Sequence, residues 1–167
     1  ESIVLKFLSC GLDIEDVELF HSVELEKIEK ARATLKSIGA ISCGKITEIG
    51  MRISKMPLEV ELSRMLIEAE KRGCLKDAIL VASILQVGFL FKREARIPKL
   101  ESGSDIVNYV KIFNQLENEY FISRDYSSEM FKQVNIKNYK RILEIRRKIC
   151  EYYERENVRV VNTSKDK

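Results

Sequence analysis

The sequence has 167 residues, of which 45% are hydrophobic and 33% are charged, and its formal net charge is +3 at pH 7. This composition is typical of a globular chain with a sizeable core, and it excludes collagen, low-complexity disorder and a disulfide miniprotein. The small net charge excludes an argument for nucleic-acid binding from overall charge alone. Only seven Gly and two Pro occur, so we expect a mainly α protein.

The start of the chain predicts two helices. Residues 1–11 are apolar enough for a short helix or for the tail of a longer one that ends at Gly11, whereas residues 12–22 are acidic and irregular. From residue 22 to residue 38 hydrophobic side chains recur at helical spacing. Ser22 can cap the start of this second helix and Gly39 can close its end, so both helix boundaries have a sequence signal.

A small hairpin and a third helix follow. Residues 41–47 predict two very short extended pieces around the glycine turn at Gly44. Thr47 can then cap a helix that must stop before Pro57. Helix, hairpin and helix together indicate a reduced winged-helix unit over residues 1–57.

Residues 58–158 predict a helical bundle. Gly73 separates its first two helices, and the second, from residue 75 to residue 91, is apolar on nearly every side, so we expect it at the centre of the bundle. Residues 159–167 have no periodicity and are expected to form a frayed tail. The predicted helices of the bundle run, in chain order, over residues 58–72, 75–91, 106–120 and 134–156.

The last predicted helix concentrates positive charge. Between residues 137 and 148 six cations stand against the single acid Glu144, which leaves a local charge of +5. A turn of about 100° per residue places Ile142, Ile145 and Ile149 on one side of the helix and five cations on the other. Cations on a solvated face are ordinary. Their clustering on one side, the missing local acidic partner of Arg146 and a stacking plane at Tyr139 point toward nucleic-acid binding, but the composition alone still favours a solvated face over a nucleic-acid-binding one. The five cations of this face are Lys137, Lys140, Arg141, Arg147 and Lys148.

Arg146 falls on the apolar side of the same helix. An unpaired charge in such a place is costly, so the guanidinium needs a carboxylate or a phosphate. We expect a carboxylate partner, with Asp105 or a nearby glutamate as first candidates.

Motifs for catalysis, metals and membranes are weak. Residues 39–45, GAISCGK, match the front of a phosphate-binding loop, but Ile46 stands where that motif needs Ser or Thr, and a helix rather than a strand precedes it. The lone His21 is read as a capping or surface residue, and the apolar run over residues 78–91 is shorter than the roughly 20 residues that cross a bilayer. We therefore predict no catalytic residue and no membrane partner.

The cysteines predict neither a metal site nor disulfides. They lack zinc-ligand spacing and are scattered among apolar neighbours, which fits reduced thiols in an intracellular protein. The chain also begins without Met, directly in an apolar run, so we expect a fragment of a longer protein. The four cysteines are Cys10, Cys43, Cys74 and Cys150.

Several segments resemble the C-terminal region of DEAH-box RNA helicases. Residues 35–58, LKSIGAISCGKITEIGMRISKMPL, resemble the winged-helix end of that family. Residues 57–67, PLEVELSRMLI, and residues 73–87, GCLKDAILVASILQV, resemble the opening helices of its ratchet domain, and residues 138–149, NYKRILEIRRKI, resemble its basic late helix. The segments keep the family's order and cover almost the whole chain.

This resemblance implies a function. It implies that the chain is an accessory region of an ATP-dependent RNA helicase, in which RecA-like motor domains outside this sequence bind ATP and magnesium. The ratchet would complete the channel for single-stranded RNA, with Lys137, Lys140, Arg141, Arg147 and Lys148 along the RNA path. The fragment itself would hold no cofactor. Its implied partners are single-stranded RNA, its own motor domains and a possible glycine-rich-patch activator protein, and a nuclear location in mRNA processing is favoured, or the cytoplasm in a bacterium.

Two other functions stay open at this point. A winged-helix DNA-binding regulator would present Arg, Asn or Gln on the helix over residues 22–38, but Glu24, Glu26 and Glu29 share that helix and repel phosphates. A non-enzymatic helical module that binds other proteins would leave the basic face solvated.

Overall fold

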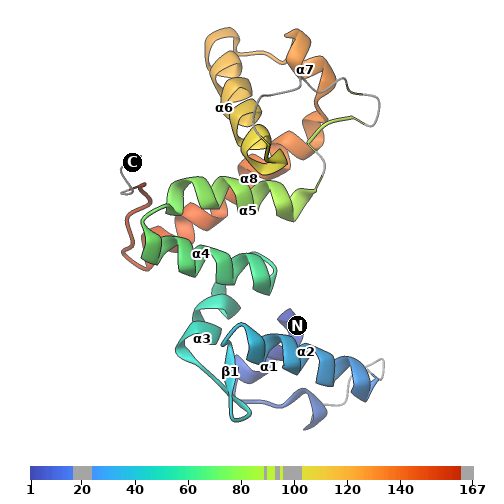
Figure 1. The fold of residues 1–167 in the computed structure, drawn as a ribbon, viewed down its shortest axis with the longest axis vertical. Helices are drawn as coiled ribbons and strands as arrows, with labels where there is room; N and C mark the ends of the chain where they lie inside the picture. Colours follow the sequence, from blue (N-terminus) through green and yellow to red (C-terminus); the bar gives the residue numbers. More distant parts are fainter. Residues whose placement is uncertain (17–23, 89, 93–94, 96–102, 163–167) are drawn as a thin grey trace. The chain divides into compact units, whose positions relative to one another are not determined.

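The computed structural model describes residues 1–16, 24–88, 90–92, 95 and 103–162 (Figure 1). The chain divides into two compact units, residues 1–71 and residues 72–167. Within the described residues the regular elements are helices and one two-stranded antiparallel hairpin. The mainly α, ratchet-like fold class with a tiny hairpin is thereby confirmed.

The first unit forms around α1, which contacts α2, α3 and the hairpin strand β2. Leu5 of α1, Leu35 of α2 and Ile53 of α3 are each at most 2% exposed, so the three helices share one core. The division between the two units falls after Lys71, near the end of the helix α4. The domain boundary predicted after residue 57 stays a prediction. The elements are α1 (Ser2–Ser9), the 3-10 helix η1 (Ile14–Asp16), α2 (Leu25–Ser37), β1 (Ile41–Ser42), β2 (Lys45–Ile46), α3 (Glu48–Lys55) and α4 (Val60–Arg72).

The hairpin forms where the sequence predicted it. Ile41 pairs with Ile46 and Ser42 pairs with Lys45. The two residues between the strands, Cys43 and Gly44, have φ angles of 49° and 75°, which is the left-handed conformation that a tight two-residue turn requires. The glycine-lysine segment is therefore the end of α2 followed by a hairpin, as the sequence context indicated.

Thr47 caps α3, which confirms a second prediction. Its hydroxyl accepts a hydrogen bond from the Gly50 amide at 3.0 Å and donates one to the Gly39 carbonyl at 2.7 Å. A side chain at Gly50 would place its Cβ 2.0 Å from the Ala40 carbonyl oxygen, so only glycine permits this close approach. The helix α2 begins at Leu25 after Glu24, and the predicted cap Ser22 and the lone His21 lie outside the described residues.

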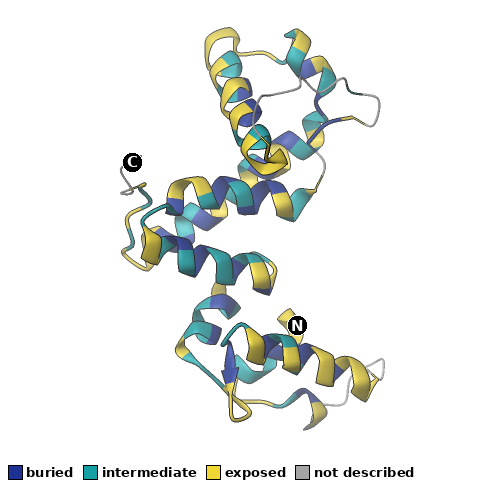
Figure 2. Ribbon diagram, in the orientation of Figure 1, coloured by how far each residue is buried: buried dark blue, intermediate teal, exposed yellow. Residues whose placement is uncertain are grey.

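The second unit contains α5 (Leu75–Val87), α6 (Asp105–Ser123), α7 (Glu129–Gln133) and α8 (Ile136–Arg155). The apolar α5 packs against α8 along its length and also contacts α6, so its predicted central place in the bundle is confirmed (Figure 1). Figure 2 shows buried residues along both α5 and α8. Phe113, Leu116 and Ile142 are fully buried in this core.

The helix α5 is shorter than predicted. It ends at Val87 rather than near Phe91, because Gly88 adopts a φ of +88° and breaks the helical path. Leu90 and Phe91 continue as buried extended residues, and Phe91 forms an isolated β-bridge with Val134. An apolar run that continues past a helix end is not distinguishable from the helix by hydrophobicity alone.

The short helix α7 was not predicted from the sequence. Its cap is Ser128, whose hydroxyl accepts from the Phe131 amide at 3.3 Å and donates to Glu119 at 2.5 Å. Phe131 is 2% exposed and packs its ring edge-on against Tyr139, with centroids 5.4 Å apart. Because only one large side chain of this helix is buried, hydrophobic periodicity gives it no clear signal.

The described part of the predicted tail is held against α5. Asn162 forms an isolated antiparallel bridge with Cys74, and its side-chain oxygen accepts a hydrogen bond from the Asp77 amide at 3.3 Å. Residues 163–167 lie outside the described residues.

Candidate nucleic-acid interface

The helix α8 presents one apolar face and one charged face. Asn135 caps its start by accepting a hydrogen bond from the Asn138 amide at 3.2 Å. Ile142 and Ile149 are fully buried and Tyr152 is 3% exposed, which confirms the predicted helical phase. The opposite face is solvent-exposed, and all five predicted site residues lie on it: Lys137, Lys140, Arg141, Arg147 and Lys148.

The cations in the second half of α8 are already paired. Arg147 forms an ion pair with Glu151, one helical turn further along. Lys148 pairs with Glu144 at 2.7 Å, one turn before it. The hydrogen bond from Lys148 lowers the pKa of Glu144 below its ordinary value, which favours the charged carboxylate in this pair. These pairs reduce the positive charge that the second half offers to a ligand.

The cations in the first half of α8 differ. Among the described residues, Lys137, Lys140 and Arg141 have no carboxylate within ion-pair distance. The Lys140 ammonium lies over the ring of Tyr126, 5.2 Å from its centroid, which is a cation–π contact and leaves its charge uncompensated. The first half of the face therefore holds the available positive charge. We call Lys137, Lys140 and Arg141 the basic triplet.

The acids of this face neutralise more of its positive charge than the sequence analysis predicted. Glu144 and Glu151 follow Arg141 and Lys148 at helical spacing and lie on the same stripe as the cations. The sequence window from residue 137 to residue 148 includes only the first of them. Checking every cation for an acid four residues away, in either direction, would have revealed both pairs, and also a pair of Lys140 with Glu144 that the structure does not form.

Tyr139 does not offer a stacking plane, contrary to our prediction. It is 1% exposed and its ring packs 5.1 Å from that of Phe113, centroid to centroid. Burial raises the pKa of Tyr139 to about 12, so its hydroxyl stays neutral. The ring that lies beside the basic triplet is Tyr126, which is half-buried and stacks on Tyr120 at 4.9 Å.

Arg146 has the carboxylate partner that its position predicted. Its two terminal nitrogens donate to the two oxygens of Glu117 on α6, at 2.7 Å and 2.5 Å, in a bidentate pair. The partner is thus a glutamate and not Asp105. The hydrogen bonds from Arg146 to Glu117 raise the pKa of the guanidinium, which is charged at any physiological pH. This pair joins α6 to α8.

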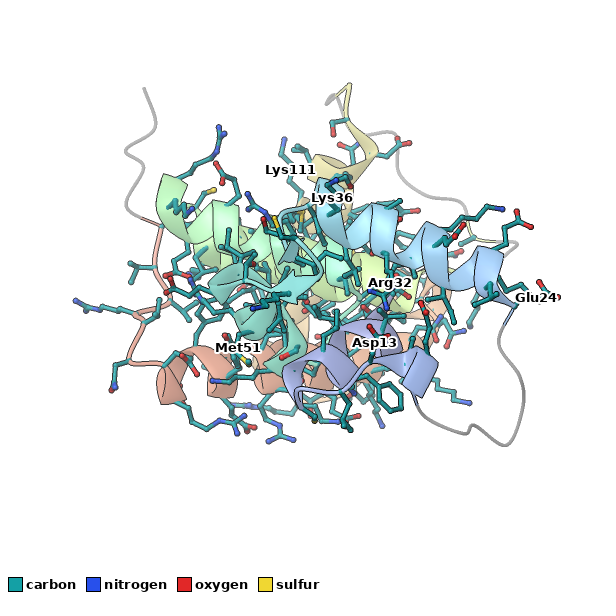
Figure 3. All side chains as sticks on the ribbon, turned by 90° about the horizontal axis from the view of Figure 1, so that it is seen from below. Asp13, Glu24, Arg32, Lys36, Met51 and Lys111 are labelled. Carbon is teal, nitrogen blue, oxygen red and sulfur yellow. The ribbon has the colours of Figure 1, made fainter. Side chains whose placement is uncertain are left out.

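Two of the three exposed cations of α2 are paired with acids at its start, while Lys36 has no carboxylate within ion-pair distance among the described residues. Lys27 lies 3.1 Å from Glu24, and Lys30 lies 2.7 Å from Glu26. Arg32 points toward Asp13 instead, at 2.5 Å, and this contact lowers the pKa of the Asp13 carboxyl (Figure 3). A helix with this charge pattern is poorly suited to lie against DNA phosphates.

No group of three or more described His, Cys, Asp or Glu residues is arranged to hold a metal ion. All four cysteines are free thiols. In the part of the chain that the structure describes, every helix is too short or too polar to cross a bilayer.

Comparison with known proteins gives a consistent picture. Residues 59–141 match the family described as "Helicase associated domain (HA2), ratchet-like". The chain is 26% identical over 163 residues to the ATP-dependent RNA helicase HrpA of Escherichia coli. This alignment covers 87% of this chain and 12% of that protein. It is 36% identical over 93 residues to a putative ATP-dependent RNA helicase of Schizosaccharomyces pombe, covering 54% of this chain and 8% of that protein.

A plant protein adds to this picture. The chain is 29% identical over 126 residues to the pre-mRNA-splicing factor ATP-dependent RNA helicase DEAH10 of Arabidopsis thaliana, covering 68% of this chain and 18% of that protein. The matched region thus spans less than a fifth of each of these three relatives.

Proposed function

We propose that this chain is an accessory region of an ATP-dependent RNA helicase. Its residues 59–141 belong to the helicase-associated (HA2), ratchet-like family. Three relatives named as ATP-dependent RNA helicases support this proposal, because each aligns with at least half of the chain. The chain contributes to RNA handling and leaves ATP hydrolysis to motor domains of the parent protein.

The observation that supports RNA binding most directly is the basic triplet. Lys137, Lys140 and Arg141 are exposed and lie on one face of α8, and none has a carboxylate within ion-pair distance among the described residues, although Arg141 is near enough to Glu144 to help lower the pKa of that carboxyl. Phosphates attract such cations without any base being read. A translocating enzyme needs contacts of this kind, since every nucleotide must bind and then be released. Arg147 and Lys148 extend the same face but share their charge with Glu151 and Glu144.

In the parent helicase, we place this face along the path of single-stranded RNA. The helical unit would act as a passive wall of the channel and pack on the RecA-like motor domains, which bind ATP and magnesium. The winged-helix unit would connect this wall to the motors and offer a docking surface for a glycine-rich-patch activator. The proposed location is intracellular, in the nucleus for a splicing helicase or in the cytoplasm of a bacterium.

A salt titration of RNA binding tests the proposal. Filter binding of single-stranded RNA to the 167-residue chain should weaken as salt increases, with little dependence on RNA sequence. With three phosphates neutralised by the basic triplet, the slope of log K against log salt should be about −2, from about 0.7 per phosphate. A slope of about −3.5 would mean that all five cations of the face act equally.

A charge reversal locates the contact. Lys140→Glu together with Arg141→Glu should lower RNA affinity while leaving the melting temperature nearly unchanged, because both side chains are exposed. In the full-length helicase the same double variant should reduce RNA-stimulated ATP hydrolysis. Absence of RNA binding by the unaltered chain and by the parent's channel would favour the protein-interaction module instead.

A further inference from the structure

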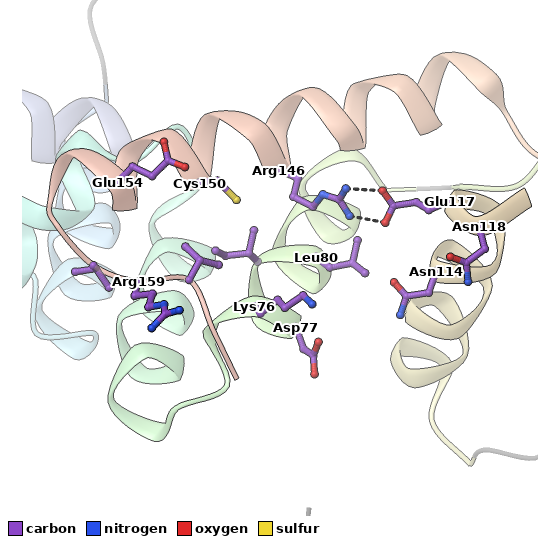
Figure 4. Close-up of a pocket in the computed structure, with 13 residues that line it drawn as sticks. Lys76, Asp77, Leu80, Asn114, Glu117, Asn118, Arg146, Cys150, Glu154 and Arg159 are labelled. Atoms are coloured by element: carbon purple, nitrogen blue, oxygen red, sulfur yellow. Dashed lines mark hydrogen bonds and ion pairs between the residues drawn. The ribbon is translucent and has the colours of Figure 1, made fainter. Parts of the chain in front are cut away.

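A second feature of the helical unit is a pocket on the side of α8 that faces away from the basic triplet. It has a volume of about 820 Å³ and lies between α5, α6, α8 and the extended residues after α8 (Figure 4). Arg146 is one of the residues that line it. Arg146 lies nine residues after Lys137, and at about 100° per residue the two side chains point to opposite sides of the helix. The pocket is therefore separate from the phosphate-binding face.

The charges around the pocket cancel. Three cations and three acids line it, so the pocket has no net charge that would attract a phosphate or a metal ion. A ligand that suits it is uncharged, with an apolar surface and hydrogen-bonding edges. The charged lining residues are Lys76, Arg146, Arg159, Asp77, Glu117 and Glu154.

Arg146 is held rigidly at the inner part of this pocket. Its terminal nitrogens are fixed by the bidentate pair with Glu117, and its guanidinium carbon lies 5.7 Å from the ring centroid of Phe113. Arg146 is also one of the residues that line the pocket. A planar, immobilised guanidinium is a surface on which an unpaired nucleobase stacks well.

Polar groups for the edge of a base are also present. Asn114 and Asn118 lie one turn apart on α6, and both carboxamides reach toward the pocket from the side opposite Leu80 of α5 (Figure 4). A carboxamide offers a donor and an acceptor together, which is the pattern that base edges complement. Leu80 is 5% exposed and supplies apolar surface between them.

From this arrangement we infer that the pocket binds a single unpaired nucleobase, stacked near Arg146 and hydrogen-bonded by Asn114 and Asn118. The inference rests on the proposed RNA function and deepens it, because it assigns the phosphates and one base to different sides of α8. An open pocket of this volume admits a base that stays attached to its strand.

Uncharged ribonucleosides test the pocket without the phosphate face. Adenosine, guanosine, cytidine and uridine are titrated one by one into the full chain, and the side-chain amide signals of Asn114 and Asn118 are followed by NMR. Saturable shifts of both signals with at least one nucleoside are expected. If all four nucleosides leave both signals unmoved, the pocket is not a base site and the inference is wrong.

Two single-stranded probes distinguish binding in the pocket from binding at the basic triplet. One is a single-stranded RNA of ten nucleotides and the other is the same backbone without bases. Asn114→Ala with Asn118→Ala should weaken binding of the RNA by about tenfold and leave the baseless strand unaffected, since the hydrogen bonds to the base edge are lost while Arg146 is kept. Lys140→Glu with Arg141→Glu should weaken binding of both strands.

The matched control is Gln115→Ala, an exposed amide on α6 that does not line the pocket. It should change neither affinity. Equal RNA affinities for the Asn114→Ala/Asn118→Ala variant and the unaltered chain would overturn the base site while the phosphate face stands. Nucleoside shifts in a chain that binds neither strand would instead keep the base site and remove the phosphate face.

Discussion

The two halves of α8 carry the same kinds of side chain but differ in what those side chains contact. In the first half, the basic triplet of Lys137, Lys140 and Arg141 has no carboxylate partner among the described residues. In the second half, Arg147 pairs with Glu151 and Lys148 pairs with Glu144. Charge available to a ligand is therefore concentrated in the first half, although the sequence places cations along the whole helix.

The two halves of α8 also differ in which of their cations stabilise the fold and which are available to a ligand. Neighbouring residues show it most clearly: Arg147 makes an exposed pair within its own helix, while Arg146 makes a bidentate pair with Glu117 of α6. Exposed pairs within a helix contribute little to stability, whereas pairs removed from water become costly to break. The second half of α8 is thus the anchoring half of the helix, and the first half is the half available to a ligand.

The largest expected effect is on stability, in the anchoring half. Arg146→Met should lower the free energy of unfolding by about 2 kcal/mol, because it leaves the Glu117 carboxylate without its partner. This value is reduced from that of a fully buried pair because Arg146 and Glu117 are 30% and 31% exposed. Urea denaturation followed by circular dichroism measures the change.

The neighbouring arginine provides the control for this substitution. Arg147→Met makes the same chemical change one residue along, where the pair is exposed and local, and should cost no more than about 0.5 kcal/mol. The double variant Arg146→Met with Glu117→Gln should recover part of the lost stability, because it removes the stranded charge. Equal destabilisation by the two single arginine variants would remove the proposed contrast between neighbouring residues.

The next effect is on RNA affinity and compares the halves directly. Lys140→Glu with Arg141→Glu should weaken binding of single-stranded RNA by about twenty-five-fold at 0.1 M salt, from about fivefold for each of two lost phosphate contacts. Arg147→Glu with Lys148→Glu changes the net charge by the same amount, yet should weaken binding only about threefold. If both variants weaken binding equally, the pairs with Glu151 and Glu144 do not withhold charge from RNA.

The sequence predicted much of this site because helical phase follows from the spacing of apolar residues. The buried face of α8, the exposure of its five cations and the need of Arg146 for a carboxylate all depend on that phase. The turn at Cys43 and Gly44 and the cap at Thr47 were predictable for a similar reason, because their signals are local.

Features that depend on distant residues were not predictable in the same way. Glu117 is 29 residues from Arg146, so only the packing of α6 on its neighbours selects it over other acids. Tyr139 looked available for stacking because the sequence does not show that Phe113 and Phe131 surround it. The end of α5 was misplaced because buried Leu90 and Phe91 prolong the apolar run after Gly88.

A smaller effect should follow when the second half is made to resemble the first. Glu144→Gln with Glu151→Gln releases Lys148 and Arg147 from their pairs and keeps the side-chain shapes. RNA affinity should rise about fivefold at 0.1 M salt, and the salt slope should steepen from about −2 toward about −2.8, which corresponds to one further phosphate contact at about 0.7 per phosphate. Filter binding across a salt series measures both quantities, and an unchanged slope would show that these cations lie off the RNA path.

The smallest effect is the titration of Glu144 itself. The hydrogen bond from Lys148 lowers the pKa of the Glu144 carboxyl below the ordinary 4.5, so the folded state holds the charged form more strongly than the unfolded chain does. The stabilising contribution of the pair is therefore fully present above that ordinary value and is lost as the pH falls through the lowered pKa. A carboxyl-detected NMR titration should place the Glu144 midpoint below 4.5, and Lys148→Ala should move it upward. Because Glu144 is exposed, the melting temperature should hardly respond to the same substitution. A midpoint that stays in place without Lys148 would mean that the ion pair is not formed in solution, and the second half of α8 would then offer RNA as much charge as the first.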